Sequence, residues 1–140
     1  MIVLDTDHLI ELERRGSSKG WKVLERLQAQ HDPHAATVIS VEEQFRGRLA
    51  SINQIPAGLR QVHPYSRLFE LLEFYSAWTI LPFDQVAAQR FLDLRAARIR
   101  IGTMDLKIAA IALVHGATLL SANLKDFRQV PELTVEDWVS

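Results

Sequence analysis

Short apolar segments alternate along the chain with longer amphipathic ones, and this alternation limits the fold more than any other feature. Four segments of three or four residues are rich in aliphatic and β-branched side chains: residues 2–4, 36–39, 79–81 and 118–120. A weaker segment of the same kind follows at residues 133–135. Strands separated by helices usually form parallel sheets, because each helix carries the chain back across the sheet. We therefore predict an α/β fold: a three-layer α/β/α sandwich with a short, mainly parallel central sheet.

The segments between the strands carry signals for helix ends. The first helix is predicted to run from Thr6 to Gly16, since Gly adopts the left-handed backbone common at a helix C-terminus. Further helices are predicted to begin at Ser40, after Asp84 and near Met104. Residues 53–64 contain two Pro and one Gly and are predicted to be a loop or a helix break. No internal repeat divides the chain, so we expect residues 1–140 to form one domain.

Composition excludes several classes of protein. The chain has no Cys, which excludes disulfide scaffolds, iron–sulfur clusters, Cys-ligated zinc and thiol nucleophiles. Its five His residues form no H-E-x-x-H pattern, so no zinc site is predicted. The net charge of −1 excludes binding of nucleic acid by bulk charge alone. No apolar run is long enough to cross a membrane and no signal peptide is evident, so we expect a cytoplasmic protein without a membrane partner.

Polar side chains directly follow two of the predicted strands. Asp5 comes after the first strand, and Ser121 and Asn123 come after the fourth. Ligands bind at the carboxyl ends of strands in parallel sheets. Three further carboxylates belong to segments expected near the same edge: Glu43, Asp105 and Asp126. Converging carboxylates repel one another, and a hard cation such as Mg²⁺ or Mn²⁺ relieves this repulsion while accepting only oxygen ligands.

Each of these acids also has a purely structural explanation. Residues 40–43 fit the S-x-x-E capping box, whose acid only accepts a backbone hydrogen bond at a helix start. Asp105 can complement a helix dipole, and Asp126 can be a turn residue. Asp5 and Asp7 can cap the first helix, although a carboxylate directly after a buried strand is costly unless it caps, pairs or binds metal. The combination of positions, rather than any single one, favours a metal site.

Four short motifs occur in order along the chain. They are Asp5-Thr6-Asp7 after an apolar strand, Glu43 with Gly47 four residues later, Asp105 leading into Ile108-Ala109-Ala110, and Thr118-Leu119-Leu120-Ser121-Ala122-Asn123 with the tail through Trp138. In this order and at this spacing, the motifs resemble those of the PIN-domain ribonucleases, in particular the VapC toxins of bacterial toxin–antitoxin pairs. The resemblance covers the whole chain.

The resemblance implies a PIN fold and a Mg²⁺- or Mn²⁺-dependent endoribonuclease. By motif, it implies that Asp5, Glu43 and Asp105 are the catalytic, metal-binding carboxylates. It also implies three associations: an RNA substrate, a homodimer, and a VapB-like antitoxin that occupies the site and brings the pair to promoter DNA. Residues 68–78, followed by Ile80 and Phe83, carry more apolar surface than one face of a small domain needs. Core packing is the alternative and is expected for most of these side chains, while an exposed part would suit a dimer seam or a groove for an antitoxin helix.

One position departs from the family pattern. Many relatives carry a fourth Asp where this chain has Asn123, which can ligate a metal through its carbonyl oxygen but adds no charge. Asp126 can replace it as a ligand, and a one-metal site is favoured over a two-metal site. Ser121 and Thr6 are predicted to orient a ligand carboxylate or a substrate phosphate.

Basic side chains near the motifs are expected to contact the RNA backbone, with Arg46 and Lys107 as the candidates and a solvated helix face as the alternative for each. The alternative function is a non-catalytic PIN-like module that binds RNA or protein, which the uncharged Asn123 motivates. A third hypothesis is a hydrolase that acts on small phosphate esters.

Overall fold

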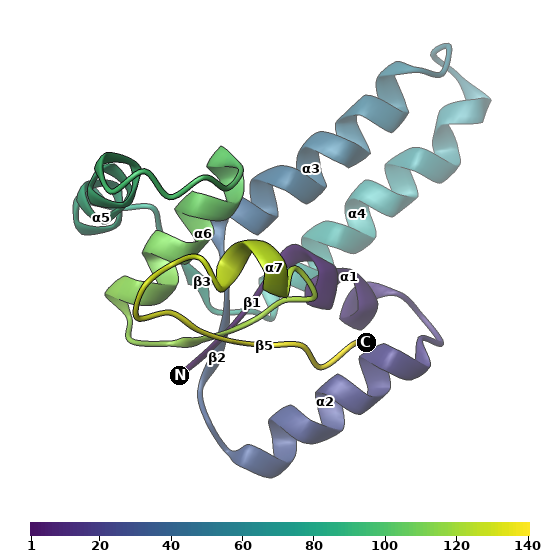
Figure 1. The fold of residues 1–140 in the computed structure, drawn as a ribbon. Coiled ribbons are helices and arrows are strands. Elements are labelled where there is room, and N and C mark those ends of the chain that lie inside the picture. The colour runs from purple at the N-terminus through teal and green to yellow at the C-terminus, as the bar shows by residue number, and fades with distance from the viewer.

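The computed structural model covers residues 1–140 and contains five short strands and seven α-helices (Figure 1). The strands are β1 (Ile2–Leu4), β2 (His34–Thr37), β3 (Ile80–Leu81), β4 (Thr118–Leu120) and β5 (Thr134–Glu136). The helices are α1 (Thr6–Glu13), α2 (Ser18–Gln30), α3 (Val38–Asn53), α4 (Val62–Ser76), α5 (Gln85–Ala96), α6 (Thr103–Val114) and α7 (Leu124–Phe127), with a 3₁₀ turn at Leu59–Gln61. No helix is long and apolar enough to span a membrane.

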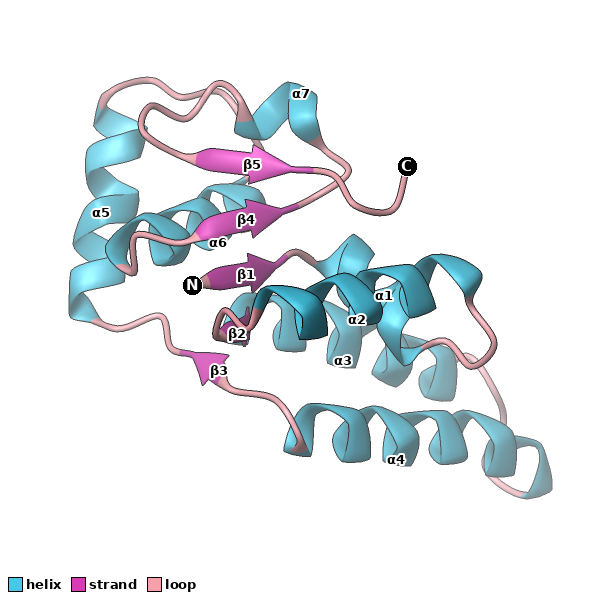
Figure 2. Cartoon of the chain, turned by 90° about the horizontal axis from the view of Figure 1, so that it is seen from below, coloured by secondary structure: helices cyan, strands magenta, loops and turns pink.

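The five strands form one sheet in the order β3-β2-β1-β4-β5, and every neighbouring pair is parallel. Figure 2 shows β1, β4 and β5 side by side and pointing the same way. In the central pair, Leu4 of β1 lies opposite Leu120 of β4. The residues after these two strands therefore leave the sheet at the same edge. The predicted α/β fold is confirmed, and the sheet is parallel throughout.

Side chains alternate between the two faces of the sheet, as they must in a strand. Val3 and Leu119 pack into one apolar cluster, together with residues of α5 and α6. Ile2, Leu4 and Leu120 pack into a second cluster with residues of α1, α2 and α4. Helices thus cover both faces of the sheet, which confirms the predicted three layers.

Helices α3 and α4 pack against each other and extend beyond the sheet as a long hairpin (Figure 1). On α4, Leu71 and Tyr75 are buried against the core. The opposite side of the same helix is apolar as well, and more than half of each side chain there is exposed: Val62, Tyr65, Phe69 and Leu72. We call these four residues the α4 stripe. The predicted excess of apolar surface therefore exists, but it begins earlier than residue 68.

The start of α3 differs from the prediction. The helix begins at Val38 because Thr37 caps it, with Thr37 Oγ1 accepting a hydrogen bond of 3.2 Å from the backbone N–H of Ser40. Strand β2 correspondingly ends at Thr37 rather than at residue 39. Ser40 lies inside the helix, so the capping-box interpretation of residues 40–43 is wrong. Glu43 is therefore not occupied as a capping partner of Ser40.

Residues 53–64 are more ordered than predicted. Helix α3 continues to Asn53, and α4 begins at Val62 after the 3₁₀ turn. Pro64 is the third residue of α4, where its missing N–H costs nothing because the first turn of a helix has no internal acceptor for it. Only a short link between the two helices matches the predicted loop.

Helix α1 ends at Glu13, three residues before the predicted Gly16, whereas the start of α5 and the end of α6 follow the predicted signals. The carboxylate of Asp84 accepts a 3.0 Å hydrogen bond from the N–H of Ala87 and caps α5. Gly116 adopts a left-handed backbone, with φ of 59°, just after α6. Helix α7 is not predicted at all, and it turns the segment around Asp126 from a loop into one helical turn.

Candidate active site

The carboxyl ends of β1 and β4 bring Asp5 and Ser121 together, because each follows one of the paired residues Leu4 and Leu120. The hydroxyl of Ser121 donates a hydrogen bond of 2.7 Å to Asp5 Oδ2. Asp5 Oδ1 accepts a second, also 2.7 Å, from the backbone N–H of Thr6, and so Asp5 is the cap of α1. Only 6% of Asp5 is exposed, and Ser121 is fully buried. This carboxylate is thus fixed on both oxygens inside the protein.

Helix α3 places Glu43 beside the start of α1. The hydroxyl of Thr6 donates to Glu43 Oε2 at 3.2 Å and lies 2.9 Å from Ser40 Oγ. The neighbouring acid Glu42 points the other way and forms an exposed ion pair with Arg46. Two adjacent carboxylates on one helix therefore have different surroundings, and the motif spacing selected the inward one.

Asn123 connects the two remaining acids. Its side-chain Nδ2 donates to Asp105 Oδ2 at 3.2 Å and to Asp126 Oδ2 at 3.0 Å. Asp105 lies in the first turn of α6, and Asp126 in the first turn of α7. In this arrangement Asn123 acts toward both carboxylates as a hydrogen-bond donor. The amide thus takes the place of a fourth negative charge and holds two acids together.

The three motif carboxylates all have raised pKa values. The pKa of Asp5 is raised to about 7, first by burial and second by the nearby charge of Asp7, against the lowering effect of its hydrogen bonds. Burial is also the main cause that raises the pKa of Glu43 and of Asp105. The charge of Asp105 contributes to raising the pKa of both other groups. Burial and the charges of neighbouring acids therefore raise the pKa values of these groups.

The predicted basic residues do not contact these acids. Arg46 pairs with Glu42, and its lowering effect on the pKa of Glu43 is the smallest of the causes. Lys107 Nζ lies 5.8 Å from the centre of the Phe83 ring, an arrangement typical of a cation–π contact. Neither side chain forms an ion pair with Asp5, Glu43 or Asp105, and their contact with RNA stays a prediction.

Two residues of α1 belong to this network and were not predicted as site residues. Asp7 Oδ2 accepts a 2.9 Å hydrogen bond from the backbone N–H of Ala122, and Asp7 Oδ1 lies 2.6 Å from Nδ1 of His8. Asp7 could have been found, because it stands two residues after Asp5 in the first motif. His8 carries no such signal, since its other contact comes from the far end of the chain, at Trp138.

The chemistry of this edge fits a hard divalent cation. Its side-chain donors are carboxylate, amide and hydroxyl oxygens, with no sulfur, which suits Mg²⁺ or Mn²⁺ better than zinc. No three Asp, Glu or His side chains lie close enough, as arranged here, to hold one ion. The raised pKa values nevertheless indicate that the negative charge of these acids is uncompensated, and a divalent cation would offset it.

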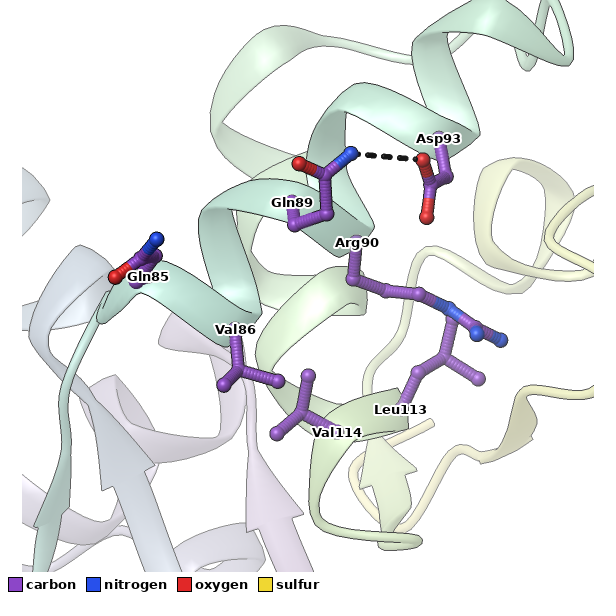
Figure 3. Close-up of a pocket in the computed structure, with 7 residues that line it drawn as sticks. All are labelled: Gln85, Val86, Gln89, Arg90, Asp93, Leu113 and Val114. Carbon is purple, nitrogen blue, oxygen red and sulfur yellow. Dashed lines mark hydrogen bonds between the residues drawn. The ribbon is translucent and has the colours of Figure 1, made fainter.

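A cavity elsewhere has a different character (Figure 3). It lies between α5 and α6, and its lining residues are Gln85, Val86, Gln89, Arg90, Asp93, Leu113 and Val114. Asp93 is the one acid in this lining, and it accepts a 3.1 Å hydrogen bond from Gln89 Nε2. None of the motif residues reaches this cavity. The concentration of acids, with Asp5 buried and Glu43 and Asp105 half-buried, marks the candidate site rather than this hollow.

Comparisons of the whole chain agree with the motifs. The PIN domain family model matches residues 2–133. Ribonuclease VapC1 of Rickettsia felis is 32% identical over 143 aligned residues, covering 96% of this chain and 93% of its own. Ribonuclease VapC of Rickettsia bellii is 31% identical with the same coverage.

Solved structures share the fold at lower identity. VapBC2 from Rickettsia felis, bound to a DNA fragment from its promoter, matches with a TM-score of 0.75 and 24% identity over 99% of each chain. DNA-bound VapBC from Salmonella typhimurium matches with a TM-score of 0.77 and 24% identity over 98% of this chain and 97% of its own. The chain therefore belongs to the PIN domain family, and its relatives in that family are VapC ribonucleases of toxin–antitoxin systems.

Proposed function

We propose that this protein is a metal-dependent endoribonuclease toxin of a toxin–antitoxin pair. The observation that carries the proposal is that the three motif carboxylates Asp5, Glu43 and Asp105 all have raised pKa values and form no ion pair with a basic side chain, and that Asp105 helps to raise the pKa of the other two. The relatives named as VapC ribonucleases support the same activity. With RNA as its substrate, the protein would act in the cytoplasm.

The side chains divide the work of such a site. When bound, Mg²⁺ or Mn²⁺ would offset negative charge on the phosphate and lower the pKa of water. Ser121 fixes the orientation of Asp5, and Thr6 fixes that of Glu43. The carboxylates orient a water molecule for in-line attack on phosphorus, and one of them accepts the proton that this water loses. The bond from phosphorus to the leaving oxygen breaks, and that oxygen takes up a proton from solvent. We propose Asn123 and Asp126 as the outer ligands, with Asn123 holding Asp126 against Asp105.

The paired residues Glu43 and Glu42 offer a direct test. Glu43→Gln removes the inward carboxylate, and Glu42→Gln removes its exposed neighbour on the same helix. We expect wild type and Glu42→Gln to cleave single-stranded RNA with Mg²⁺, and both to stop when EDTA is added. Glu43→Gln should lose about a hundredfold or more in rate, since removing one group that supports a developing charge typically has that effect. Equal cleavage with and without EDTA would overturn the metal dependence.

The alternative function has its own outcome in this assay. Asn123 in place of an acid would suit a PIN-like module that binds RNA or protein without cleaving it. If wild type cleaves no RNA, and isothermal titration shows no binding of Mn²⁺ at millimolar concentration, the non-catalytic function is favoured.

The α4 stripe supports a protein partner. Its four apolar residues, spaced three or four apart, form a continuous line on the projecting hairpin, a pattern typical of a surface that receives another helix. The structures matched by this fold are complexes of toxin with antitoxin. We propose that the protein forms a homodimer, that a VapB-like antitoxin also binds it, and that promoter DNA is contacted only through the antitoxin.

The partner proposal can be tested by mass. Phe69→Glu places a charge in the centre of the α4 stripe, whereas Glu73→Gln changes an exposed residue of the same helix. By light scattering we expect a dimer for wild type and Glu73→Gln, and weaker association of Phe69→Glu with itself or with a co-expressed antitoxin. A monomeric wild type that binds no antitoxin would contradict the proposal.

A further inference from the structure

The C-terminal segment, residues 136–140, ends beside α1 and α2 (Figure 1). The backbone N–H of Trp138 donates a 3.0 Å hydrogen bond to Nε2 of His8, which is fully buried. An imidazole nitrogen that accepts a hydrogen bond carries no proton, so the ring proton of neutral His8 lies on Nδ1. His8 Nδ1 is 2.6 Å from Asp7 Oδ1 and donates to it. The main-chain N–H of Trp138 thus determines that Nδ1 of His8 carries the proton donated to Asp7.

Asp7 passes this constraint on to the site. Its other oxygen, Oδ2, accepts from the N–H of Ala122 at 2.9 Å and lies 3.4 Å from Ser121 Oγ. Ser121 Oγ in turn donates to Asp5 at 2.7 Å. A continuous series of hydrogen bonds therefore joins Trp138 through His8 and Asp7 to the segment that orients Asp5. The hydrogen bonds from Trp138 to His8, from His8 to Asp7 and from Ser121 to Asp5 are buried or partly buried, whereas the one from Ala122 to Asp7 is exposed.

The C-terminal segment is itself held in place. The guanidinium of Arg26 lies over the Trp138 ring, 4.0 Å from its centre, and Nη2 of Arg26 lies 3.8 Å from a carboxylate oxygen of Glu136. The carbonyl of Glu136 accepts from the N–H of Ser121 at 2.9 Å. The buried indole Nε1–H of Trp138 has no partner, so the polar role of this residue belongs to its main chain. Glu136 therefore contacts Ser121, and Trp138 contacts His8.

We propose that the main chain at Trp138 and the side chain of His8 position the carboxylate site, by fixing Asp7 and through it Ser121 and Asp5. His8 is a positioning residue in this proposal, since it touches neither metal nor substrate. The inference rests on the proposed function for its consequence, which is metal binding, and on the hydrogen bonds alone for its structural part. Groups that orient metal ligands usually change metal affinity by ten- to a hundredfold when they are removed.

Two pairs of variants isolate the hydrogen bonds. Trp138→Pro and Trp138→Ala both lose the indole, but only Pro also lacks the backbone N–H that His8 accepts. His8→Leu has no polar group, whereas His8→Asn keeps an N–H that can donate to Asp7. Thermal unfolding identifies the temperature at which each variant is folded. Titration with Mn²⁺ alone and the amide resonances of Thr6 and Ala122 then report on the site.

We expect Trp138→Pro to bind Mn²⁺ about tenfold or more weakly than Trp138→Ala, and His8→Leu about tenfold or more weakly than His8→Asn. The Thr6 and Ala122 amide resonances should move in the first member of each pair and stay near wild type in the second. Equal affinity and equal resonances within both pairs would overturn the proposal. If wild type binds no Mn²⁺, the proposed metal dependence is wrong, and the amide resonances alone decide the positioning role.

Discussion

The two ends of helix α1 carry buried acids with opposite surroundings. Asp5 caps the first turn with 6% of its surface exposed, and Glu13 ends the helix with 7% of its side chain exposed. Glu13 lies 3.3 Å from Arg48 and 3.5 Å from Arg67, so two cations compensate its charge. Asp5 has only hydrogen-bond donors, from Ser121 and Thr6, and further acids beyond them.

The helix dipole makes this contrast sharper. A negative charge is favoured at the N-terminus of a helix, where Asp5 lies, and disfavoured at the C-terminus, where Glu13 lies. The pKa of Asp5 is nevertheless raised, because burial and the charge of Asp7 outweigh the dipole and the hydrogen bonds. Two acids whose side chains are largely shielded from solvent are therefore compensated differently. Glu13 ties α1 to α3 and α4 through its arginines, whereas Asp5 has no cation beside it.

The largest effect should separate the two acids by activity. Asp5→Asn is expected to lower RNA cleavage about a thousandfold, or ~4 kcal/mol in barrier, because the site loses a charged oxygen that no other group replaces. Glu13→Gln should cleave within a few fold of wild type wherever it is folded. Initial rates at saturating Mg²⁺ measure this. Similar losses in both variants would remove the functional distinction between the two ends of α1.

The pH dependence of stability should come from the Asp5 end. An acid whose pKa is raised on folding holds its proton more tightly in the folded chain, so its stabilising effect is complete below the unfolded value of 3.8. That effect is lost as the pH rises toward about 7, the folded value. We expect Asp5→Asn, which cannot titrate, to gain about 3–4 kcal/mol on metal-free wild type between pH 4 and pH 7.5.

Urea unfolding of the metal-free protein measures this difference. Glu13→Gln serves as the control and should keep the pH dependence of wild type, because Asp5 is intact in it. Parallel stability curves for wild type and Asp5→Asn would show that the raised pKa of Asp5 does not govern the pH dependence.

Removing Glu13 should lower stability directly. Glu13→Gln leaves Arg48 and Arg67 without their shared carboxylate, and Nε of Arg48 already lacks a partner. Both arginines are partly exposed, so we expect a loss of about 1–2 kcal/mol rather than the larger cost of a fully buried unpaired charge. The urea midpoint at pH 7.5 measures it. A Glu13→Gln variant as stable as wild type would mean that the arginines find other partners at no cost.

The smallest expected effect concerns Asn123. Asn123→Asp replaces the amide that donates to Asp105 and Asp126 with a third carboxylate. Metal-free stability at pH 7.5 should fall by about 1 kcal/mol through repulsion, while Mn²⁺ affinity rises several-fold. Calorimetric titration with Mn²⁺ and urea unfolding give the two values. A gain in metal-free stability would contradict the role assigned to the amide.

The fold and the contact between Asp5 and Ser121 followed from local signals. Short apolar strands that end in polar residues predicted the parallel sheet and its functional edge, and the register of β1 and β4 then brings Asp5 beside Ser121. The spacing from Glu43 to Gly47 selected Glu43 over Glu42, and the two side chains do point in opposite directions. The strand pattern depends on periodicity, which a sequence carries, whereas the choice of Glu43 rested on the resemblance to the PIN-domain family.

The features that the sequence did not indicate depend on contacts between residues of different helices and strands. Thr37, rather than Ser40, caps α3, and the choice between two hydroxyls three residues apart is made by where β2 ends. Lys107 lies against Phe83 of a distant segment, and His8 accepts from Trp138, which follows it by 130 residues. Such pairings exist only once the whole sheet has formed.

The pairing of Leu4 with Leu120 has a consequence for how this chain can change. Successive residues of a strand point to opposite faces, so inserting or deleting one residue in β1 or β4 would turn Asp5 or Ser121 away from its partner. Exchanging one aliphatic side chain for another of similar volume within these strands would leave that geometry in place. In β1 and β4, the number of residues is therefore under a stricter constraint than their identity.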